Sequence, residues 1–275
     1  MKWIFLKNLE LSLIKFLISI PDTPHKCPRL IIFFLSGIIK KFHPENIIEI
    51  GVASGLTTLI LARTMYDLGI RGNITSVDIS STFCNDINKR TGFLFNEYRS
   101  KTMWEGEYHL FCGLDTIRTI EKLNVSFDLC ILDTRHTLPG ELLDFICILP
   151  FMKSKSLIVL HDINWDQYIR EQDQFLRAEM IKASNGILFS SVVSPAKFIN
   201  SLNNNFFPNI GAFVVDANTT KYILNIFLSL MILWHSMPDQ FLLDNYRYII
   251  SKYYPKELLH IYDAAYSKNK LLHNK

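Results

Sequence analysis

The sequence predicts an α/β fold, a doubly wound and mostly parallel sheet of seven strands. Three features predict it: seven runs rich in Ile, Val and Leu, helical periodicity between the first five of them, and a small-residue turn directly after the first. Strands that are apolar along their whole length are typical of parallel sheets that helices cover on both faces. The expected strands are Asn46–Ile50, Asn73–Asp78, Tyr108–Phe111, Phe127–Asp133, Leu157–His161, Ile187–Val193 and Gly211–Val215.

Apolar residues spaced three and four positions apart place helices between these strands. The expected helices are Leu56–Leu68, Phe83–Tyr98, Asp115–Lys122 and Gly140–Phe151. An Asn-rich stretch joins the last two strands, which we expect to form an antiparallel edge. Periodicity thus divides the chain into a helical N-terminal extension at residues 1–43, the sheet domain at residues 44–216, and a helical C-terminal extension at residues 217–275.

Charge and cysteine content exclude several classes of protein. With 29 Lys and Arg against 26 Asp and Glu, the net charge is +3, which gives no broad cationic surface for nucleic acid. The five cysteines form no Cys-x-x-Cys pair, which is typical of free thiols in a reducing compartment rather than of disulfides or a zinc site. We therefore expect a cytoplasmic protein that does not bind nucleic acid.

The apolar N-terminal run resembles a signal peptide only at first sight. Lys7, Glu10 and Lys15 interrupt it, and no small-residue cleavage site follows. Its apolar positions instead suit an amphipathic helix. We expect this helix to pack on the domain or on a second subunit of a homo-oligomer, with peripheral membrane contact as the alternative.

A turn of small residues follows the first expected strand. Gly51 and Gly55 allow a tight turn and the close approach of a ligand to the backbone. Ala53 replaces the middle glycine of the dinucleotide fingerprint, and no lysine follows Gly55 as a P-loop requires. Ser54 lacks the flanking glycines of a hydrolase nucleophile elbow. The remaining pattern is an acidic residue, Glu49, before Gly-x-x-x-Gly, and a tight turn without a ligand is the alternative interpretation.

Asp78 ends the second expected strand, and Ile79 follows it. A carboxylate at this place can accept hydrogen bonds from both hydroxyls of a ribose, whereas the alternative is a solvated strand end. Together with the glycine turn, this residue resembles class I S-adenosylmethionine (SAM) dependent methyltransferases. SAM carries an ammonium and a sulfonium group but no phosphate, so the resemblance gives Glu49 a favourable electrostatic role beside the ligand.

Acidic and histidine residues follow the fourth and fifth expected strands. Asp133 and His136 follow the fourth strand, and His161 and Asp162 end the fifth. We expect these side chains to meet at the edge of the sheet where the glycine turn lies. Histidine titrates near neutral pH and suits a general base, so His161 is the first candidate and His136 the second, with Asp162 or Asp133 orienting the imidazole. The alternative for both histidines is a structural hydrogen bond.

Four segments carry a narrower resemblance, namely IIEIGVASGLTTLILA, TSVDIS, FDLCILDTRHT and LIVLHDI. In this order they are similar to a bacterial class I methyltransferase group (methyltransferase domain 24-like) associated with small-molecule and surface-polysaccharide biosynthesis. The resemblance covers residues 44–216 and implies a Rossmann-like sheet with SAM as the cofactor. The residues expected to bind the cofactor are Glu49, Gly51, Ala53, Ser54, Gly55, Asp78, Ile79, Asp115 and Asp133.

The sequence also departs from the pattern of this group. Thr134 and Arg135 stand where the group has Gly and Asp, and Ile163 stands where related catechol-type enzymes have an Asn metal ligand. These departures favour a metal-free mechanism over a Mg²⁺-assisted one. Leu114 stands where an adenine-contacting acid is expected, and Asp115 comes one position later.

The sequence therefore predicts a SAM-dependent O-methyltransferase that acts on a small molecule or on a sugar of a surface glycan. Two alternatives remain at this point: a nucleotide-dependent oxidoreductase on a similar sheet, and a non-catalytic SAM-fold module that binds a partner. Methylation of nucleic acid is disfavoured because the chain lacks both a basic excess and a motif for a flipped base.

Overall fold

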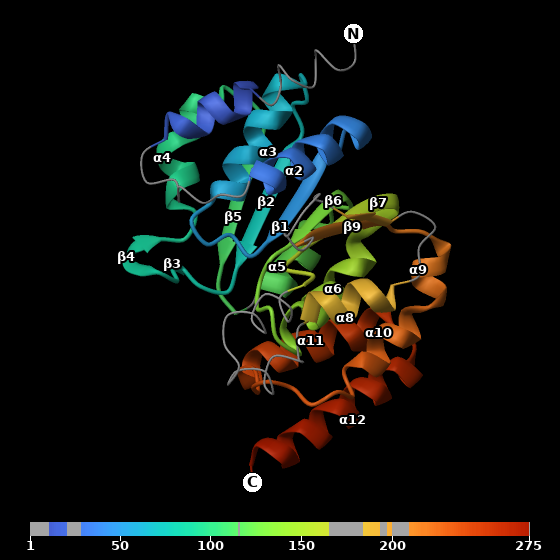
Figure 1. The fold of residues 1–275 in the computed structure, drawn as a ribbon. Coiled ribbons are helices and arrows are strands. Elements are labelled where there is room, and N and C mark those ends of the chain that lie inside the picture. Colours follow the sequence, from blue (N-terminus) through green and yellow to red (C-terminus); the bar gives the residue numbers. More distant parts are fainter. Residues whose placement is uncertain are drawn as a thin grey trace. The chain divides into compact units, whose positions relative to one another are not determined.

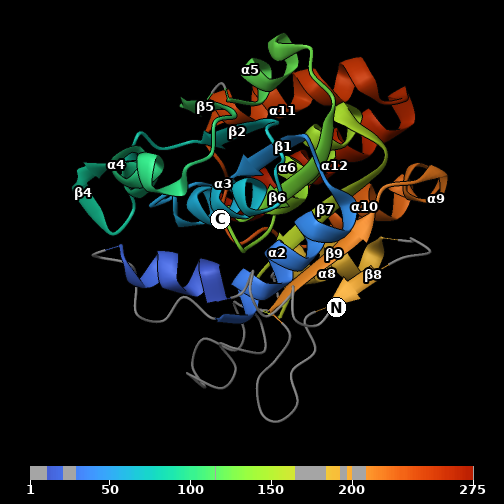
Figure 2. The same cartoon turned by 90° about the horizontal axis from the view of Figure 1, so that it is seen from above.

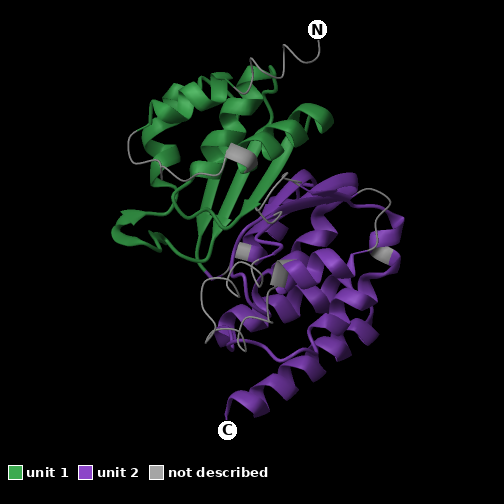
Figure 3. Ribbon diagram, viewed as in Figure 1, with its two compact units in different colours: residues 1–113 green, residues 114–275 purple. Residues whose placement is uncertain are grey.

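The computed structural model describes residues 11–20, 29–114, 116–164, 184–192, 197–199 and 209–274. The chain divides into two compact units, residues 1–113 and residues 114–275 (Figure 3). Each unit contains parallel strands, covering helices and its own apolar core.

Unit 1 is built on three parallel strands in the order β5-β2-β1. They are β1 (Asn46–Ile50), β2 (Asn73–Asp78) and β5 (Glu107–Cys112). The β1 residues Ile47 and Ile48 point to opposite faces of the sheet, and both are buried. This two-sided burial explains why β1 is apolar almost throughout, as a parallel strand covered on both faces requires.

Helices cover the strands of unit 1. They are a helix at residues 11–18, α2 (Arg29–Phe42), α3 (Leu56–Asp67) and α4 (Phe93–Thr102). Helix α3 packs between α2 and α4 (Figure 2).

The amphipathic helix expected near the N-terminus packs on unit 1. Its residues Leu13, Phe16 and Leu17 are buried. The guanidinium of Arg63 donates to the hydroxyl of Ser12 at 2.8 Å and lies 5.5 Å from the centre of the Phe16 ring. The first ten residues of the chain lie outside the described residues.

The helix expected at Phe83–Tyr98 is wrong over its first half. An antiparallel hairpin takes its place, formed by β3 (Thr82–Phe83) and β4 (Asp86–Arg90), and α4 begins only after Gly92. The Asp86 carboxylate accepts a hydrogen bond from the backbone N–H of Asn88 at 3.1 Å, a local bond that competes with helix formation. Asn and Asp favour turns for this reason. The helical spacing of the apolar residues nevertheless led to the prediction of a helix over this segment.

Unit 2 is built on four strands in the order β6-β7-β9-β8. They are β6 (Phe127–Leu132), β7 (Met152–His161), β8 (Lys197–Ile199) and β9 (Ile210–Val214). Strands β6 and β7 are parallel, whereas β9 is antiparallel to both β7 and β8. The antiparallel edge expected from the sequence is therefore present.

The strand expected at Ile187–Val193 is wrong. Residues Ser184–Ser191 form helix α8, and β8 takes the edge position instead. A short apolar run fits either a strand or a helix by periodicity alone. Leu188 and Val192 are the buried side chains here, and their spacing of four positions matches the period of a helix.

The remaining helices of unit 2 include most of the C-terminal part of the chain. They are α5 (Thr116–Leu123), α6 (Gly140–Ile148) with a 3-10 turn at Leu149–Phe151, α9 (Ala217–Lys221), α10 (Ile223–Ser229), α11 (Gln240–Tyr253) and α12 (Lys256–His273). Trp234 and Tyr262 are fully buried, and the Tyr262 hydroxyl donates to the Leu243 carbonyl at 3.0 Å. These aromatic residues are core contacts whose polar atoms find partners.

The seven strands follow the order β5-β2-β1-β6-β7-β9-β8, and the sheet is mostly parallel (Figure 1). This order and the flanking helices confirm the doubly wound, Rossmann-like fold class predicted from the sequence. Among the described helices, none has the length and apolar character that crossing a bilayer requires.

Candidate active site

The glycine turn of unit 1 has an unusual backbone. Gly51, Ala53 and Gly55 have φ angles of 91°, 47° and 84°, all in the left-handed region. A Cβ atom on Gly55 would lie 3.0 Å from the Cα of Gly92, so a side chain there would require the neighbouring backbone to shift. Ala53 adopts a conformation that costs a non-glycine residue about 1 kcal/mol. The turn between β1 and α3 therefore depends on left-handed backbone conformations at three of its residues.

Asp78, at the end of β2, binds the backbone of this turn. Its Oδ2 atom accepts hydrogen bonds from the N–H groups of Val52 and Ala53 at 2.9 and 3.2 Å, and its Oδ1 atom accepts one from Ser80 at 2.9 Å. The next residue, Ile79, is exposed. The carboxylate predicted to bind a ribose thus lies directly against the glycine turn.

Glu49 faces the interior of unit 1. Its side chain is buried, and its Oε2 atom accepts hydrogen bonds from the hydroxyls of Thr58 and Ser76 at 2.5 and 2.7 Å. Thr58 lies in the first turn of α3 and Ser76 lies in β2, so Glu49 connects three elements that shape the turn. This geometry indicates that Glu49 stabilises the glycine turn from the buried interior of unit 1.

Other residues expected to bind the cofactor have different surroundings. The carbonyls of Ala53 and Ser54 accept hydrogen bonds from the N–H groups of Gly92 and Leu94, both at 2.9 Å, and so hold the start of α4. Asp115 lies outside the described residues, and Asp133 belongs to unit 2.

Unit 2 brings together the four acidic and histidine residues predicted at its strand ends. The His161 Nδ1 atom lies 3.1 Å from Asp162 Oδ2 and 3.4 Å from Asp133 Oδ1. The His136 Nε2 atom lies 3.0 Å from the same Asp162 oxygen and 3.9 Å from Asp133 Oδ1. Asp162 has a φ angle of 54°, and this left-handed conformation follows directly after β7. We call these four residues the Asp/His cluster.

Sequence reasoning missed two members of the surrounding network. The buried Glu141, in the first turn of α6, lies with its Oε1 atom 3.0 Å from His136 Nδ1 and accepts the N–H of Thr134 at 3.1 Å. The side-chain amide of Asn209 donates to Asp162 Oδ1. The sequence does offer one indication of Glu141, since it is an acidic residue at the start of an otherwise apolar helix. A carboxylate is favourable at a helix N-terminus.

Thr134, which departs from the family pattern, also has an identifiable role. Its hydroxyl donates to Asp144 Oδ2 at 2.7 Å, and the hydroxyl of Tyr246 donates to Asp144 Oδ1 at 2.6 Å. The loop after β6 is thereby held to α6 and α11. The carbonyl of Arg135 accepts the N–H of Glu141 at 3.4 Å.

The carboxylates of the cluster raise the pKa of both histidines. Burial by itself lowers the pKa of His136, but the hydrogen bond and charge of Glu141, together with Asp162 and Asp133, raise it to about 9. Burial likewise opposes the charged form of His161, and Asp133 and Asp162 outweigh it and hold the pKa well above its usual range. At neutral pH the folded protein therefore favours protonated imidazoles.

The same environment shifts the pKa values of the two buried acids, Glu141 and Asp162, in opposite directions. Burial raises the pKa of Glu141 to about 7, although its hydrogen bond with His136 opposes this. Burial also acts to raise the pKa of Asp162, but the hydrogen bond and charge of His161 and the charge of His136 bring it below its usual value. Asp162 is thus the ionised partner that both imidazoles share.

The Asp/His cluster does not fit Mg²⁺. Asp133, His136 and Asp162 each offer a ligand atom, and these atoms lie within 4.8 Å of one another. Mg²⁺ requires octahedral oxygen ligands, whereas one donor here is an imidazole and the apolar Ile163 is buried at the position of the missing Asn ligand. His136 Nε2 also lies 3.0 Å from Asp162 Oδ2, and a metal ion bound by both residues would have to replace this direct contact.

We therefore expect methyl transfer to persist after treatment with EDTA and gel filtration. The physical reason is that protons, not a cation, balance the carboxylates of the cluster. The measurement is the initial rate before and after treatment, with Mg²⁺ or Mn²⁺ added back in parallel. A loss of activity that either ion restores would contradict the expectation and support the metal-assisted alternative.

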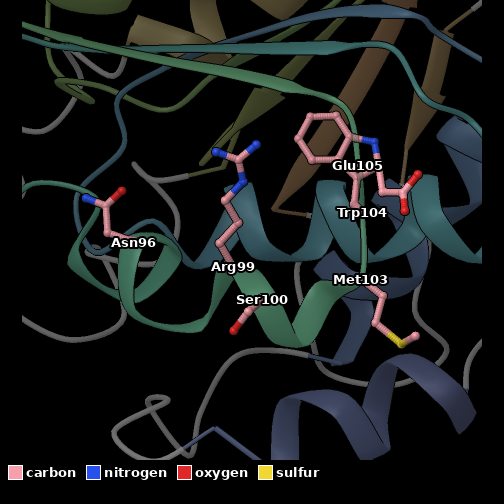
Figure 4. Close-up of a pocket in the computed structure, with 6 residues that line it drawn as sticks. All are labelled: Asn96, Arg99, Ser100, Met103, Trp104 and Glu105. Carbon is pink, nitrogen blue, oxygen red and sulfur yellow. The ribbon is translucent and has the colours of Figure 1, made fainter.

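A shallow hollow of about 620 Å³ lies at the end of α4 (Figure 4). It is lined by Asn96, Arg99, Ser100, Met103, Trp104 and Glu105. Arg99 donates to the Gly106 carbonyl at 3.0 Å, and the Trp104 indole donates to the Ile70 carbonyl at 3.1 Å. None of the predicted cofactor-binding or catalytic residues lines this hollow, so we assign it neither role.

Comparison with known proteins identifies the domain. A family model described as a methyltransferase domain matches residues 48–163. The match begins in β1 before the glycine turn and ends directly after Asp162, so it includes both regions described above. The predicted class, a class I SAM-dependent methyltransferase, is confirmed, while the match does not distinguish the surface-polysaccharide group.

Solved structures show the same fold at low sequence identity. A Staphylococcus aureus protein, provisionally assigned as a caffeoyl-CoA O-methyltransferase, is 15% identical, with a TM-score of 0.50 over 77% of this chain and 92% of that chain. A Bacillus cereus O-methyltransferase in complex with SAH is 16% identical, with a TM-score of 0.48 over 77% and 90%. The O-methyltransferase TomG of Streptomyces achromogenes, in complex with SAM, is 14% identical, with a TM-score of 0.49 over 78% and 90%. No curated protein sequence matches the chain significantly.

Proposed function

We propose that this protein transfers the methyl group of SAM to a hydroxyl oxygen of a small molecule or of a sugar in a surface glycan. The observation that carries the proposal is the Asp/His cluster at the strand ends of a methyltransferase domain. Oxygen acceptors need a proton acceptor, and imidazoles held by carboxylates are suited to that task.

The glycine turn and Asp78 form the proposed cofactor site. Gly51 and Gly55 bring the backbone close to the ligand, and Ile79 offers an exposed apolar side chain for the adenine. The Asp78 carboxylate would accept the ribose hydroxyls, sharing its oxygens with the N–H groups that it already binds. Glu49 would act from behind the turn, through Thr58 and Ser76.

Methyl transfer is an in-line displacement at carbon. An electron pair of the acceptor oxygen forms the new C–O bond while the S–CH₃ bond breaks, and the sulfonium becomes a neutral thioether. The hydroxyl proton goes to the general base, for which we propose the neutral imidazole of His161, oriented by Asp162 and Asp133. The protein contributes mainly by positioning the two reactants.

The alternative of a nucleotide-dependent oxidoreductase has no support. Ala53 replaces the middle glycine of the dinucleotide fingerprint, and the family match is to a methyltransferase domain. A non-catalytic module is opposed by the cluster itself, because two buried acids and two imidazoles are costly to retain without a function.

Calorimetry of the purified protein tests the proposed cofactor. We expect SAM and SAH to bind with micromolar dissociation constants and NAD to give no heat of binding. Incubation of the protein with methyl-labelled SAM and a panel of phenolic, hydroxy-acid and sugar acceptors then identifies the class of hydroxyl. A folded protein that binds neither SAM nor SAH would overturn the proposal.

A further inference from the structure

Helix α10 in unit 2 exposes an apolar face. Leu224 and Leu228 have 46% and 49% of their surfaces exposed, whereas Ile226 and Phe227 on the other side of the helix are buried. An amphipathic surface helix normally presents polar residues to solvent. Helix α10 departs from this pattern, because it carries apolar residues on its exposed side as well as on its buried side. Exposed leucines one turn apart mark an interaction surface more often than a solvated face.

The apolar face continues past the end of α10. The N–H groups of Met231 and Ile232 donate to the carbonyls of Leu228 and Ser229 at 3.0 and 3.2 Å, which keeps the chain coiled. Ile232 is therefore the next residue in line after Leu224 and Leu228, and it is exposed as well.

The last turns of α12 lie beside this segment (Figure 1). The Lys268 ammonium donates to the Met231 carbonyl at 2.7 Å, and the Asn269 side chain accepts the Trp234 N–H at 2.7 Å. One turn further along α12, Leu272 is exposed. We call the exposed side chains of this region the α10 surface; they are Lys221, Leu224, Leu228, Ile232, Leu233, Lys268 and Leu272.

The two chain segments that form the α10 surface are basic. Residues 217–238 and 264–274 contain Lys221, Lys268 and Lys270 but no Asp or Glu. A surface that combines lysines with exposed leucines and no acids is complementary to anionic groups at the edge of an apolar phase.

The acidic residues that flank these segments are already bound. Asp216 accepts the N–H groups of Asn218 and Thr219 at 2.9 and 3.0 Å, at the start of α9. Asp239 accepts the Phe241 N–H at 2.8 Å, as the N-cap of α11. The Asp263 carboxylate forms a bidentate ion pair with Arg247 at 2.8 and 2.9 Å. The three carboxylates therefore bind groups of the same chain, namely backbone N–H groups or Arg247.

We propose that the α10 surface docks the protein on an anionic lipid membrane. The leucines and Ile232 would enter the boundary between headgroups and acyl chains, and Lys221 and Lys268 would lie at the level of the phosphates. A second copy of the chain is the weaker candidate, because a two-fold interface through this face would place the lysines of one copy against those of the other. The inference does not depend on the proposed methyl transfer.

Co-sedimentation of the full-length protein with vesicles tests the proposal. We expect binding to phosphatidylcholine vesicles that contain phosphatidylserine, weaker binding as salt is raised, and little binding to phosphatidylcholine alone. The double variants Leu224→Ser/Leu228→Ser and Lys221→Glu/Lys268→Glu should each weaken binding by about tenfold or more. All four positions are exposed, so the fold should persist, as circular dichroism would verify.

Ile87→Ser is the matched control, because Ile87 is an exposed apolar residue of β4 in unit 1. It should bind vesicles as the wild type does. Equal binding by wild type and both double variants would overturn the proposal and place membrane contact elsewhere, for example on the N-terminal helix. A concentration-dependent dimer that Leu224→Ser/Leu228→Ser dissociates, without vesicle binding, would assign the face to self-association instead.

Discussion

Replacing His161 with alanine is expected to lower kcat by about 10²–10⁴-fold while SAM still binds as in the wild type. A general base accepts the acceptor's proton and makes no contribution to the affinity for the cofactor. His109→Ala is a matched control, since His109 is an exposed histidine of β5 whose nearest acid, Glu107, lies 3.7 Å away. Steady-state kinetics with labelled SAM and calorimetry of SAM binding measure the two effects separately.

The pH profile identifies which imidazole is the base. Because the cluster raises the pKa of both histidines, the neutral form is the minor one at pH 7, and kcat should rise as the pH increases above neutrality towards the raised pKa of the base. This rise should vanish in His161→Ala. If it persists there and vanishes in His136→Ala, the assignment to His161 is wrong and His136 is the base.

The raised pKa values also set the sign of the effect on stability. The ion pairs between the imidazoles and Asp162 contribute fully below about pH 6.5, the pKa of an unfolded histidine, because the pKa of Asp162 lies below its usual value. That contribution is lost as the pH rises towards the folded pKa, which is about 9 for His136. Higher pH therefore converts the imidazoles to the neutral form that can act as a base. It also removes the part of the stability that their ion pairs contribute.

The strongly periodic part of the fold could be predicted from the sequence. The bounds of β1 and β2 are those expected, because both strands are buried on two faces and begin at an Asn residue. The hairpin at Thr82–Arg90 and the helix at Ser184–Ser191 could not be predicted, since local hydrogen bonds of Asp86 and one-sided burial of Leu188 decide them. Short apolar segments are assigned by their tertiary surroundings.

The candidate site also has a part that the sequence predicts and a part that it does not. Asp133, His136, His161 and Asp162 follow parallel strands, and the rule that ligands gather at strand ends predicts their meeting. Glu141 lies in a helix and Asn209 directly precedes β9, and no rule of strand order brings them to the cluster. Their contribution depends on the path of the chain between elements, which periodicity does not record.

Asp78→Ala is expected to weaken SAM binding by about 100-fold, which corresponds to the loss of two hydrogen bonds between ribose hydroxyls and a charged acceptor. The variant also removes the acceptor for the Val52 and Ala53 N–H groups, so weaker binding alone would not separate contact with the ribose from support of the turn. Asp86→Ala is the matched control, because Asp86 also accepts a backbone N–H in unit 1, in the exposed hairpin. It should bind SAM normally.

An SAH analogue that lacks both ribose hydroxyls separates the two roles of Asp78. If the carboxylate binds the ribose, the wild type should prefer SAH over the analogue, and Asp78→Ala should bind both with the same low affinity. If Asp78 only holds the turn, the variant should weaken both ligands by one factor and keep the preference of the wild type. The second outcome would transfer ribose recognition to other residues and leave Asp78, like Glu49, as support for the backbone of the glycine turn.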